Sequence, residues 1–129
     1  MKWCDRALFV SPVWYGLCTN EKQFHATLRE LGIKGSHSFM KTKQANATTH
    51  FLDGKDTCAI VALGDTSGKS TECVHGLIVH EAMHIWREIR DHVGEESPSA
   101  EFEAYAIQTI AQRLMESWHE QTKGKKRGR

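Results

Sequence analysis

The sequence predicts an α+β fold in which a small antiparallel sheet, built around a hairpin, packs on three helices. Runs of β-branched and aromatic residues occur in the first half of the chain, and apolar residues recur at helical spacing in the second half. At 129 residues, with 40% hydrophobic and 26% charged side chains, the chain has the size and composition of one globular domain. We expect that domain to span residues 1–122, followed by a basic tail over 123–129.

The first predicted elements are a strand region and a short helix. Ala7–Leu17 is rich in β-branched and aromatic residues and predicts one or two short strands, which Pro12 restricts to an edge or a break. Apolar residues at helical spacing predict a helix over Glu21–Leu31, capped by Thr19 or Asn20.

A β-hairpin is expected next. Thr48–Leu52 and Thr57–Leu63 flank the turn-forming residues Asp53 to Asp56. Cys58–Leu63 is continuously apolar, which is typical of a strand covered on both faces.

Two long helices are predicted in the second half of the chain. The first spans about Glu72–His92, with Ser70 or Thr71 as its cap and Gly94 at its end. A short connector containing serine and proline precedes the second helix, which spans about Ser99–Glu120.

Charge and cysteine usage narrow the function classes. A formal net charge of +1 favours neither a nucleic-acid nor a membrane surface. The last seven residues hold five cations and are typical of a solvated, disordered tail; binding of an anionic partner such as nucleic acid is the alternative (Lys123, Lys125, Lys126, Arg127, Arg129). The four cysteines form no CxxC pair, and neither a signal peptide nor a membrane-spanning run is evident. These features predict a cytoplasmic location with reduced thiols.

The segment with the clearest chemistry is His80-Glu81-Ala82-Met83-His84, an HExxH motif inside the first long helix. Residues four apart lie one turn apart on the same helix face, so both imidazoles can reach one zinc ion. Glu81 lies about 100° round the helix from His80, where it can reach a water molecule at the metal and act as general base.

A catalytic zinc site needs a third protein ligand, and the next helix offers two glutamates. Eighteen residues separate His84 from Glu103, and sixteen separate it from Glu101. The short connector would fold that helix back beside the first, so that one carboxylate faces the histidines.

An HExxH motif followed after 18 residues by a glutamate resembles the gluzincin pattern of zinc aminopeptidases, and thermolysin-like gluzincins use nearly the same interval. The resemblance implies His80, His84 and Glu103 as zinc ligands and Glu81 as base. Because alanine lies three residues after each glutamate, Glu101 remains the second choice. The stretch from His80 to Gln108 also resembles small uncharacterised HExxH proteins of tailed phages and prophages, which implies the bacterial host cytoplasm or the virion.

We therefore expect a zinc-dependent hydrolase, most simply a gluzincin-like metallopeptidase acting on a peptide or protein. The strand Cys58–Leu63 would line the cleft, and the substrate backbone would add to the sheet edge. One alternative is a non-catalytic zinc protein with a structural or binding role, such as a virion or assembly component. Another is a nucleic-acid binder that acts through the basic tail and carries an incidental metal.

Other chemistry-bearing residues are less favoured. The segment LGDTSGKS, residues 63–70, resembles a phosphate-binding P-loop, but Leu63 stands where the pattern needs its first glycine, so Lys69 is only a secondary candidate. Two further histidines in the predicted helix lie off the motif's face or two turns beyond it, and one histidine and two tyrosines elsewhere are expected to pack rather than to assist catalysis (His75, His92, His50, Tyr15, Tyr105).

Overall fold

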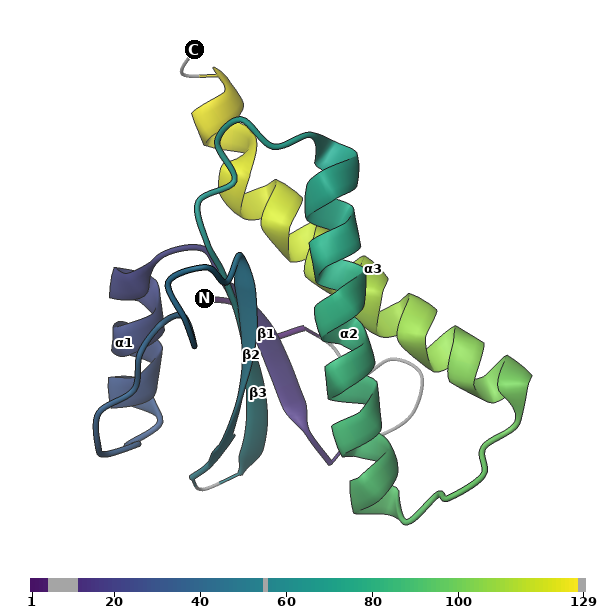
Figure 1. Ribbon diagram of the computed structural model, residues 1–129. Coiled ribbons are helices and arrows are strands. Elements are labelled where there is room, and N and C mark those ends of the chain that lie inside the picture. The colour runs from purple at the N-terminus through teal and green to yellow at the C-terminus, as the bar shows by residue number, and fades with distance from the viewer. Residues whose placement is uncertain (5–11, 55, 128–129) are drawn as a thin grey trace.

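The computed structural model describes residues 1–4, 12–54 and 56–127, and it has the predicted α+β class. Within these residues, three strands and three helices follow one another (Figure 1): β1 Trp14–Cys18, α1 Glu21–Glu30, β2 Ala47–Asp53, β3 Thr57–Leu63, α2 Thr71–Val93 and α3 Ala100–Arg127.

The sheet has the order β1-β3-β2, with β3 at its centre. β2 and β3 form the predicted antiparallel hairpin, in which Thr49 pairs with Val61. β1 runs parallel to β3, with Tyr15 opposite Ala59. The sheet is therefore mixed, whereas we expected a purely antiparallel one. The reason lies in the connection, because α1 packs against one face of the sheet before the chain enters the hairpin, and β1 therefore joins the far side of β3.

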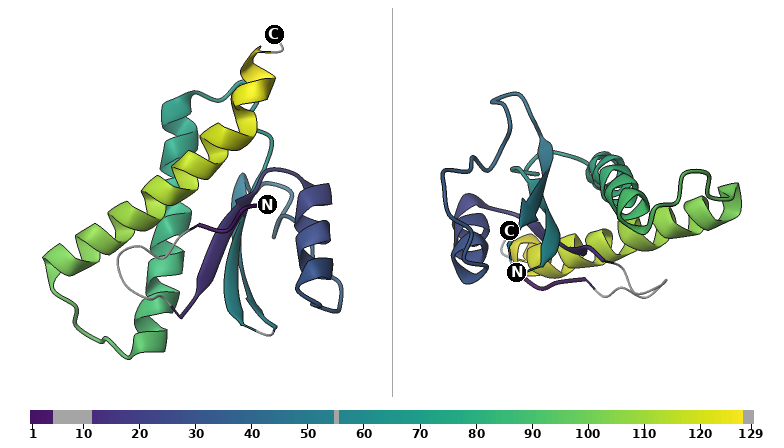
Figure 2. Two further views of the ribbon diagram at one scale, coloured as in Figure 1. Left: turned by 180° about the vertical axis from the view of Figure 1, so that it is seen from behind. Right: turned by 90° about the horizontal axis from the view of Figure 1, so that it is seen from below.

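Helices cover both faces of this sheet, as Figure 2 shows: α2 and α3 lie on one face and α1 on the other. Side chains of β3 alternate between the two layers, as the period of a strand requires. Val61 and Leu63 join the core beneath α2 and α3, whereas Ile60 and Ala62 join the core beneath α1. From Cys58 to Leu63 every residue is buried, which confirms the prediction of a strand covered on both faces.

Helix ends largely follow the predicted caps. Of the two candidates for α1, Asn20 is the cap and accepts a hydrogen bond from the Gln23 backbone. Ser70 caps α2 in the same way, and Gly94 ends it in the left-handed conformation with φ 73°.

The last helix is longer than predicted. α3 continues beyond Glu120 to Arg127, into the basic segment. Hydrogen bonds made by two residues after Glu120 stabilise this extension. Gln121 Nε2 donates to the Leu17 carbonyl at 2.9 Å, and the Thr122 hydroxyl donates to the Trp118 carbonyl at 2.8 Å. Residues 128 and 129 of the basic segment lie outside the described residues.

The N-terminal strand is shorter than the predicted Ala7–Leu17 region. β1 begins at Trp14 and forms one edge of the sheet, as Pro12 implied. Residues 5–11 lie outside the described part of the chain. The side chains of Cys4, Cys18 and Cys58 are buried, and that of Cys73 is exposed. Within the described ranges, none of the helices combines the length and apolar character needed to cross a membrane.

Candidate metal centre

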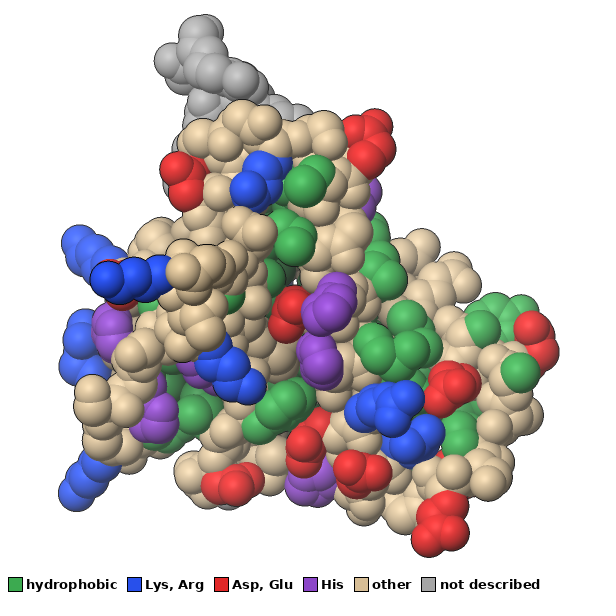
Figure 3. All heavy atoms as spheres, viewed as in Figure 1, with side chains coloured by type: hydrophobic (Ala, Val, Ile, Leu, Met, Phe, Trp, Pro, Cys, Tyr) green, Lys and Arg blue, Asp and Glu red, His purple; other side chains and the backbone are tan. Residues whose placement is uncertain are grey.

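His80 and His84 project from one face of α2 and their rings converge. Both side chains are exposed, and their Nε2 atoms lie 3.3 Å apart. Two ligand nitrogens bound to a tetrahedral zinc ion at the usual 2.0–2.1 Å lie about 3.3 Å from each other. The spacing of the two imidazoles therefore fits a single zinc ion. Figure 3 shows two adjacent histidine side chains on this surface of α2, beside an acidic side chain set deeper.

Glu81 is the most deeply set carboxylate near these histidines. It is only 6% exposed, and its Oε1 accepts a hydrogen bond from the Thr49 hydroxyl at 2.8 Å. The other carboxylate oxygen, Oε2, lies 3.9 Å from His80 Nε2. One oxygen is thus held by β2 while the second faces the histidines, which is the orientation that a general base at this site needs.

Thr49 is a site residue that sequence reasoning missed. Strand alternation places Thr49 and Phe51 on one face of β2, and the pairing of the hairpin turns that face toward α2. The sequence predicted Thr48–Leu52 as a hairpin strand, but which of its faces meets α2 depends on the packing of the whole sheet.

The strand beside the site is β2 and not Cys58–Leu63 as we expected. The apolar run of β3 made that strand the candidate, yet the same run places it in the centre of the sheet, where both of its edges are paired. β2 is an edge strand that lies next to α2, so its outer edge is the one that an extended peptide would meet.

Neither predicted third ligand is beside the histidines. Glu103 Oε2 accepts a hydrogen bond from the Trp86 indole Nε1 at 2.8 Å and lies 3.7 Å from Arg90 Nη1. Glu101 is exposed on α3. Over residues 1–4, 12–54 and 56–127 there is no group of three or more His, Cys, Asp or Glu side chains arranged to hold a metal ion. The structure brings together His80, Glu81 and His84, and a third ligand stays a prediction.

Glu103 nevertheless lies against the side of α2 from which a third ligand would approach the histidines. At about 100° per residue, Glu81 is about 100° round the helix from His80, whereas Trp86 is about 240° and Arg90 about 280° round. Glu81 and Glu103 therefore flank the histidine face from opposite sides. A third ligand from α3 would approach on the side that the base leaves open.

The remaining histidines have other partners. His75 Nε2 lies 2.9 Å from His119 Nε2, between α2 and α3, and His92 pairs with Glu88 at 3.1 Å. His75 was expected off the motif's face and His92 two turns beyond it, and each has a partner other than His80 and His84. His50 lies on the far side of the sheet against Phe24, where its Nε2 contacts the Phe39 carbonyl at 2.8 Å; burial is the main reason why its pKa falls below the ordinary value.

Of the two tyrosines considered, one packs and one does not. Tyr15 is 2% exposed in the core beneath α2 and α3, as expected. Tyr105 is 56% exposed, which contradicts the expectation of packing; it follows Glu103 by two residues and so faces away from α2.

The described site offers two converging imidazoles and an oriented, shielded carboxylate. This donor set suits a borderline ion such as Zn²⁺ with a neighbouring proton acceptor. Comparisons of the chain with models of known protein families, with curated proteins and with solved structures find no match.

Proposed function

We propose that the chain is a zinc-dependent hydrolase, most simply a metallopeptidase, in which His80 and His84 hold the metal and Glu81 is the general base. The observation that carries this proposal is the 3.3 Å separation of the two Nε2 atoms beside a carboxylate that is 6% exposed. A zinc ion with only a structural role needs no buried carboxylate oriented next to its ligands.

The chemistry divides between the metal and the chain. Bound at His80 and His84, zinc supplies Lewis acidity, which activates water and polarises a substrate carbonyl. Glu81 accepts the proton of the attacking water on Oε2 and returns it to the leaving amine. The Thr49 hydroxyl holds Oε1 at 2.8 Å and thereby keeps Oε2 turned toward the histidines.

We further propose Glu103 as the third ligand, with Glu101 as second choice. Glu103 faces α2, because it contacts Trp86 and Arg90 there, whereas Glu101 is about 200° away round α3. Metal binding would then require the Glu103 carboxylate to exchange the Trp86 indole for the zinc ion. The imidazole pair supplies two neutral ligands, so an anionic carboxylate is the natural partner for a dication.

The surroundings of the site favour an extended peptide as substrate. The edge of β2 offers main-chain hydrogen bonds, and three large apolar side chains near the site are exposed: Phe51 at 41%, Val79 at 42% and Met83 at 38%. Phe51 lies two residues after Thr49 on the same strand face, and the other two flank the histidines on α2. We therefore expect cleavage next to a hydrophobic residue.

The competing proposal is a zinc-containing binding or structural protein without turnover. The contact of Glu103 with Trp86 and Arg90 favours it, since a carboxylate held in this way completes no catalytic site. Such a protein would keep its partner binding when Glu81 is neutralised.

Metal analysis of purified protein, followed by peptide hydrolysis, separates the two proposals. We expect one zinc per chain, lost in His84→Ala and retained in His92→Ala, a control histidine on the same helix that pairs with Glu88. Glu81→Gln should retain the zinc and lose hydrolysis of a mixed peptide library. Zinc-free wild-type protein would overturn the metal assignment, and a fully active Glu81→Gln variant would overturn the assigned base.

A further inference from the structure

We propose that a cavity at the N-terminal end of α2 binds the phosphate group of a small anion. Its volume is about 360 Å³, and it is lined by the loop from Gly64 to Lys69, the first turn of α2 and the C-terminal part of α3. Thr71, on its rim, is nine positions before His80, which corresponds to about 13 Å along the helix. This cavity is therefore separate from the metal centre.

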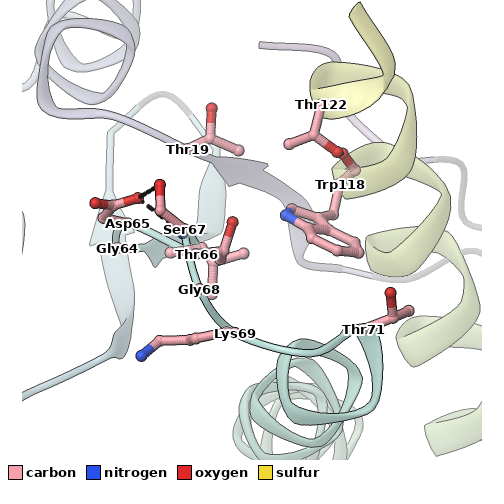
Figure 4. Close-up of a pocket in the computed structure, with 11 residues that line it drawn as sticks. Thr19, Gly64, Asp65, Thr66, Ser67, Gly68, Lys69, Thr71, Trp118 and Thr122 are labelled. Atoms are coloured by element: carbon pink, nitrogen blue, oxygen red, sulfur yellow. Dashed lines mark hydrogen bonds between the residues drawn. The ribbon is translucent and has the colours of Figure 1, made fainter. Parts of the chain in front are cut away.

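The most telling group in this cavity is the indole of Trp118. The residue is 5% exposed, and its Nε1 is buried without a hydrogen-bond partner among the described residues. Figure 4 shows that nitrogen facing the space toward Thr19 and Ser67. An indole N–H donates but does not accept, so the atom that satisfies it must be an acceptor. A phosphate oxygen is such an acceptor.

The loop itself is built as a tight turn at the start of a helix. Asp65 Oδ1 accepts hydrogen bonds from the Ser67 backbone at 2.9 Å and from the Ser67 hydroxyl at 2.6 Å. Gly68 has φ 78°, a backbone conformation that residues with a side chain rarely adopt. The chain then enters α2 through its cap, Ser70. The positive end of the α2 dipole and its first backbone N–H groups thus lie at the cavity, an arrangement that favours anions.

Charge in the lining also favours an anion with several acceptor oxygens. Thr66 and Thr71 contribute hydroxyls, and Lys69 contributes the positive charge from the loop. The carboxylate in the lining is Asp65, whose Oδ1 is already committed to Ser67, so it braces the loop instead of attracting a cation. The loop departs from the P-loop spacing at Leu63, and we accordingly infer a site for a phosphate group and not for a nucleoside triphosphate.

Phosphate titration of the full chain, followed by the indole N–H resonances in ¹H–¹⁵N spectra, tests this proposal. Inorganic phosphate should shift the Trp118 indole resonance saturably. The Trp86 indole, which donates to Glu103, provides an internal control and should not move. Glycerol 3-phosphate forms a second arm: tighter binding than inorganic phosphate identifies a phosphate monoester as the ligand, and equal binding identifies free phosphate. No Trp118 shift, or the same shift with sodium chloride at equal ionic strength, overturns the proposal.

Two substitutions with opposite expected effects on phosphate affinity provide a second test. Lys69→Met should weaken phosphate binding, and Asp65→Asn should strengthen it, each by roughly two- to fivefold, because the amide oxygen of Asn can still brace the loop. Lys34→Met, at an exposed lysine remote from the cavity, is the matched control and should change nothing. Trp118→Phe should abolish binding; if it does not fold, the Lys69 and Asp65 pair decides. Equal effects of Lys69→Met and Lys34→Met would show only general charge screening and would overturn the site.

Discussion

The Thr49 hydroxyl donates a 2.8 Å hydrogen bond to Glu81 and thereby links the edge strand β2 to the HExxH helix. Thr49 belongs to a hairpin strand and Glu81 to α2, so the bond joins the sheet to the helix at the carboxylate that we propose as the base. It also satisfies one oxygen of a carboxylate that is 6% exposed. The orientation of this carboxylate is therefore a property of the assembled fold and not of the motif alone.

Replacing Thr49 by valine should slow hydrolysis without loss of zinc. The substitution keeps the shape of the side chain but removes the donor, so Glu81 Oε1 loses its partner. We expect kcat/KM to fall by roughly 10- to 100-fold, as for other residues that orient a catalytic group, and stability to fall by about 1–3 kcal/mol. Peptide hydrolysis, metal content and urea denaturation measure the three quantities.

Thr48→Val is the matched control for that substitution. Thr48 is buried on the opposite face of β2, where its hydroxyl accepts a hydrogen bond from the Lys41 backbone at 3.2 Å. Its loss should lower stability and leave the rate of the remaining folded protein unchanged. If Thr49→Val behaves like Thr48→Val in both respects, Thr49 does not position the base.

Zinc should release the Trp86 indole from Glu103. In the structure Trp86 Nε1 donates to Glu103 Oε2 at 2.8 Å, and Trp86 is fully buried. If Glu103 becomes the third ligand, the Trp86 indole N–H resonance should shift on addition of one equivalent of zinc. The Trp118 indole should not shift, and His84→Ala should suppress the change.

Glu103→Gln should weaken zinc affinity by more than the roughly 10- to 100-fold typical of outer-shell partners. Glu101→Gln supplies the comparison, because Glu101 is exposed on α3 and should leave the affinity unchanged. Competition titration with a chromophoric chelator measures both. A larger loss in Glu101→Gln than in Glu103→Gln would reverse the assignment of the third ligand.

Local sequence signals predicted the elements of this fold well, because each depends on neighbours in the chain. The caps Ser70 and Gly94 set the ends of α2, and the turn after Asp53 set the hairpin. The convergence of His80 and His84 likewise follows from helix geometry alone. These features need no knowledge of how the sheet packs.

Long-range contacts were the part that the sequence did not determine. The parallel pairing of β1 with β3 depends on where α1 packs, and no local pattern encodes it. The apolar run of β3 indicated its burial but pointed to the wrong strand for the cleft, since the most buried strand is the central one. Spacing from His84 likewise nominated Glu103 without revealing that Trp86 and Arg90 contact its carboxylate.

Replacement by alanine should change stability in opposite directions at two glycines, one inside α2 and one at its C-terminal cap. Gly76 lies within the helix, and a Cβ added there meets nothing within 4 Å, so Gly76→Ala should stabilise the protein by about 0.5–1 kcal/mol. Gly94 has φ 73°, where a Cβ is strained, so Gly94→Ala should destabilise it by about 1 kcal/mol. Equilibrium urea denaturation of the two variants measures both changes, and changes of the same sign would contradict the helix end described here.

Alkaline pH should destabilise the protein through two buried thiols. Burial raises the pKa of Cys18 from 9.0 to about 11, and burial together with the nearby Asp53 and Asp56 raises that of Cys58 to about 11. A folded-state pKa above the unfolded value means that the fold favours the protonated thiol. The stability that this provides is fully present below pH 9 and is lost as the pH rises toward 11.

Denaturation midpoints measured from pH 8 to pH 11 should therefore fall, and the fall should be smaller in Cys18→Ala and Cys58→Ala. The exposed Cys73 is the matched control, since Cys73→Ala should leave the slope unchanged. The same contrast applies to alkylation of the folded protein at pH 8, where Cys73 should react first, because a buried thiol with a raised pKa yields little thiolate. Rapid labelling of Cys18 or Cys58 in the native state would show that the core beneath α1 opens far more readily than its packing against Phe24 implies.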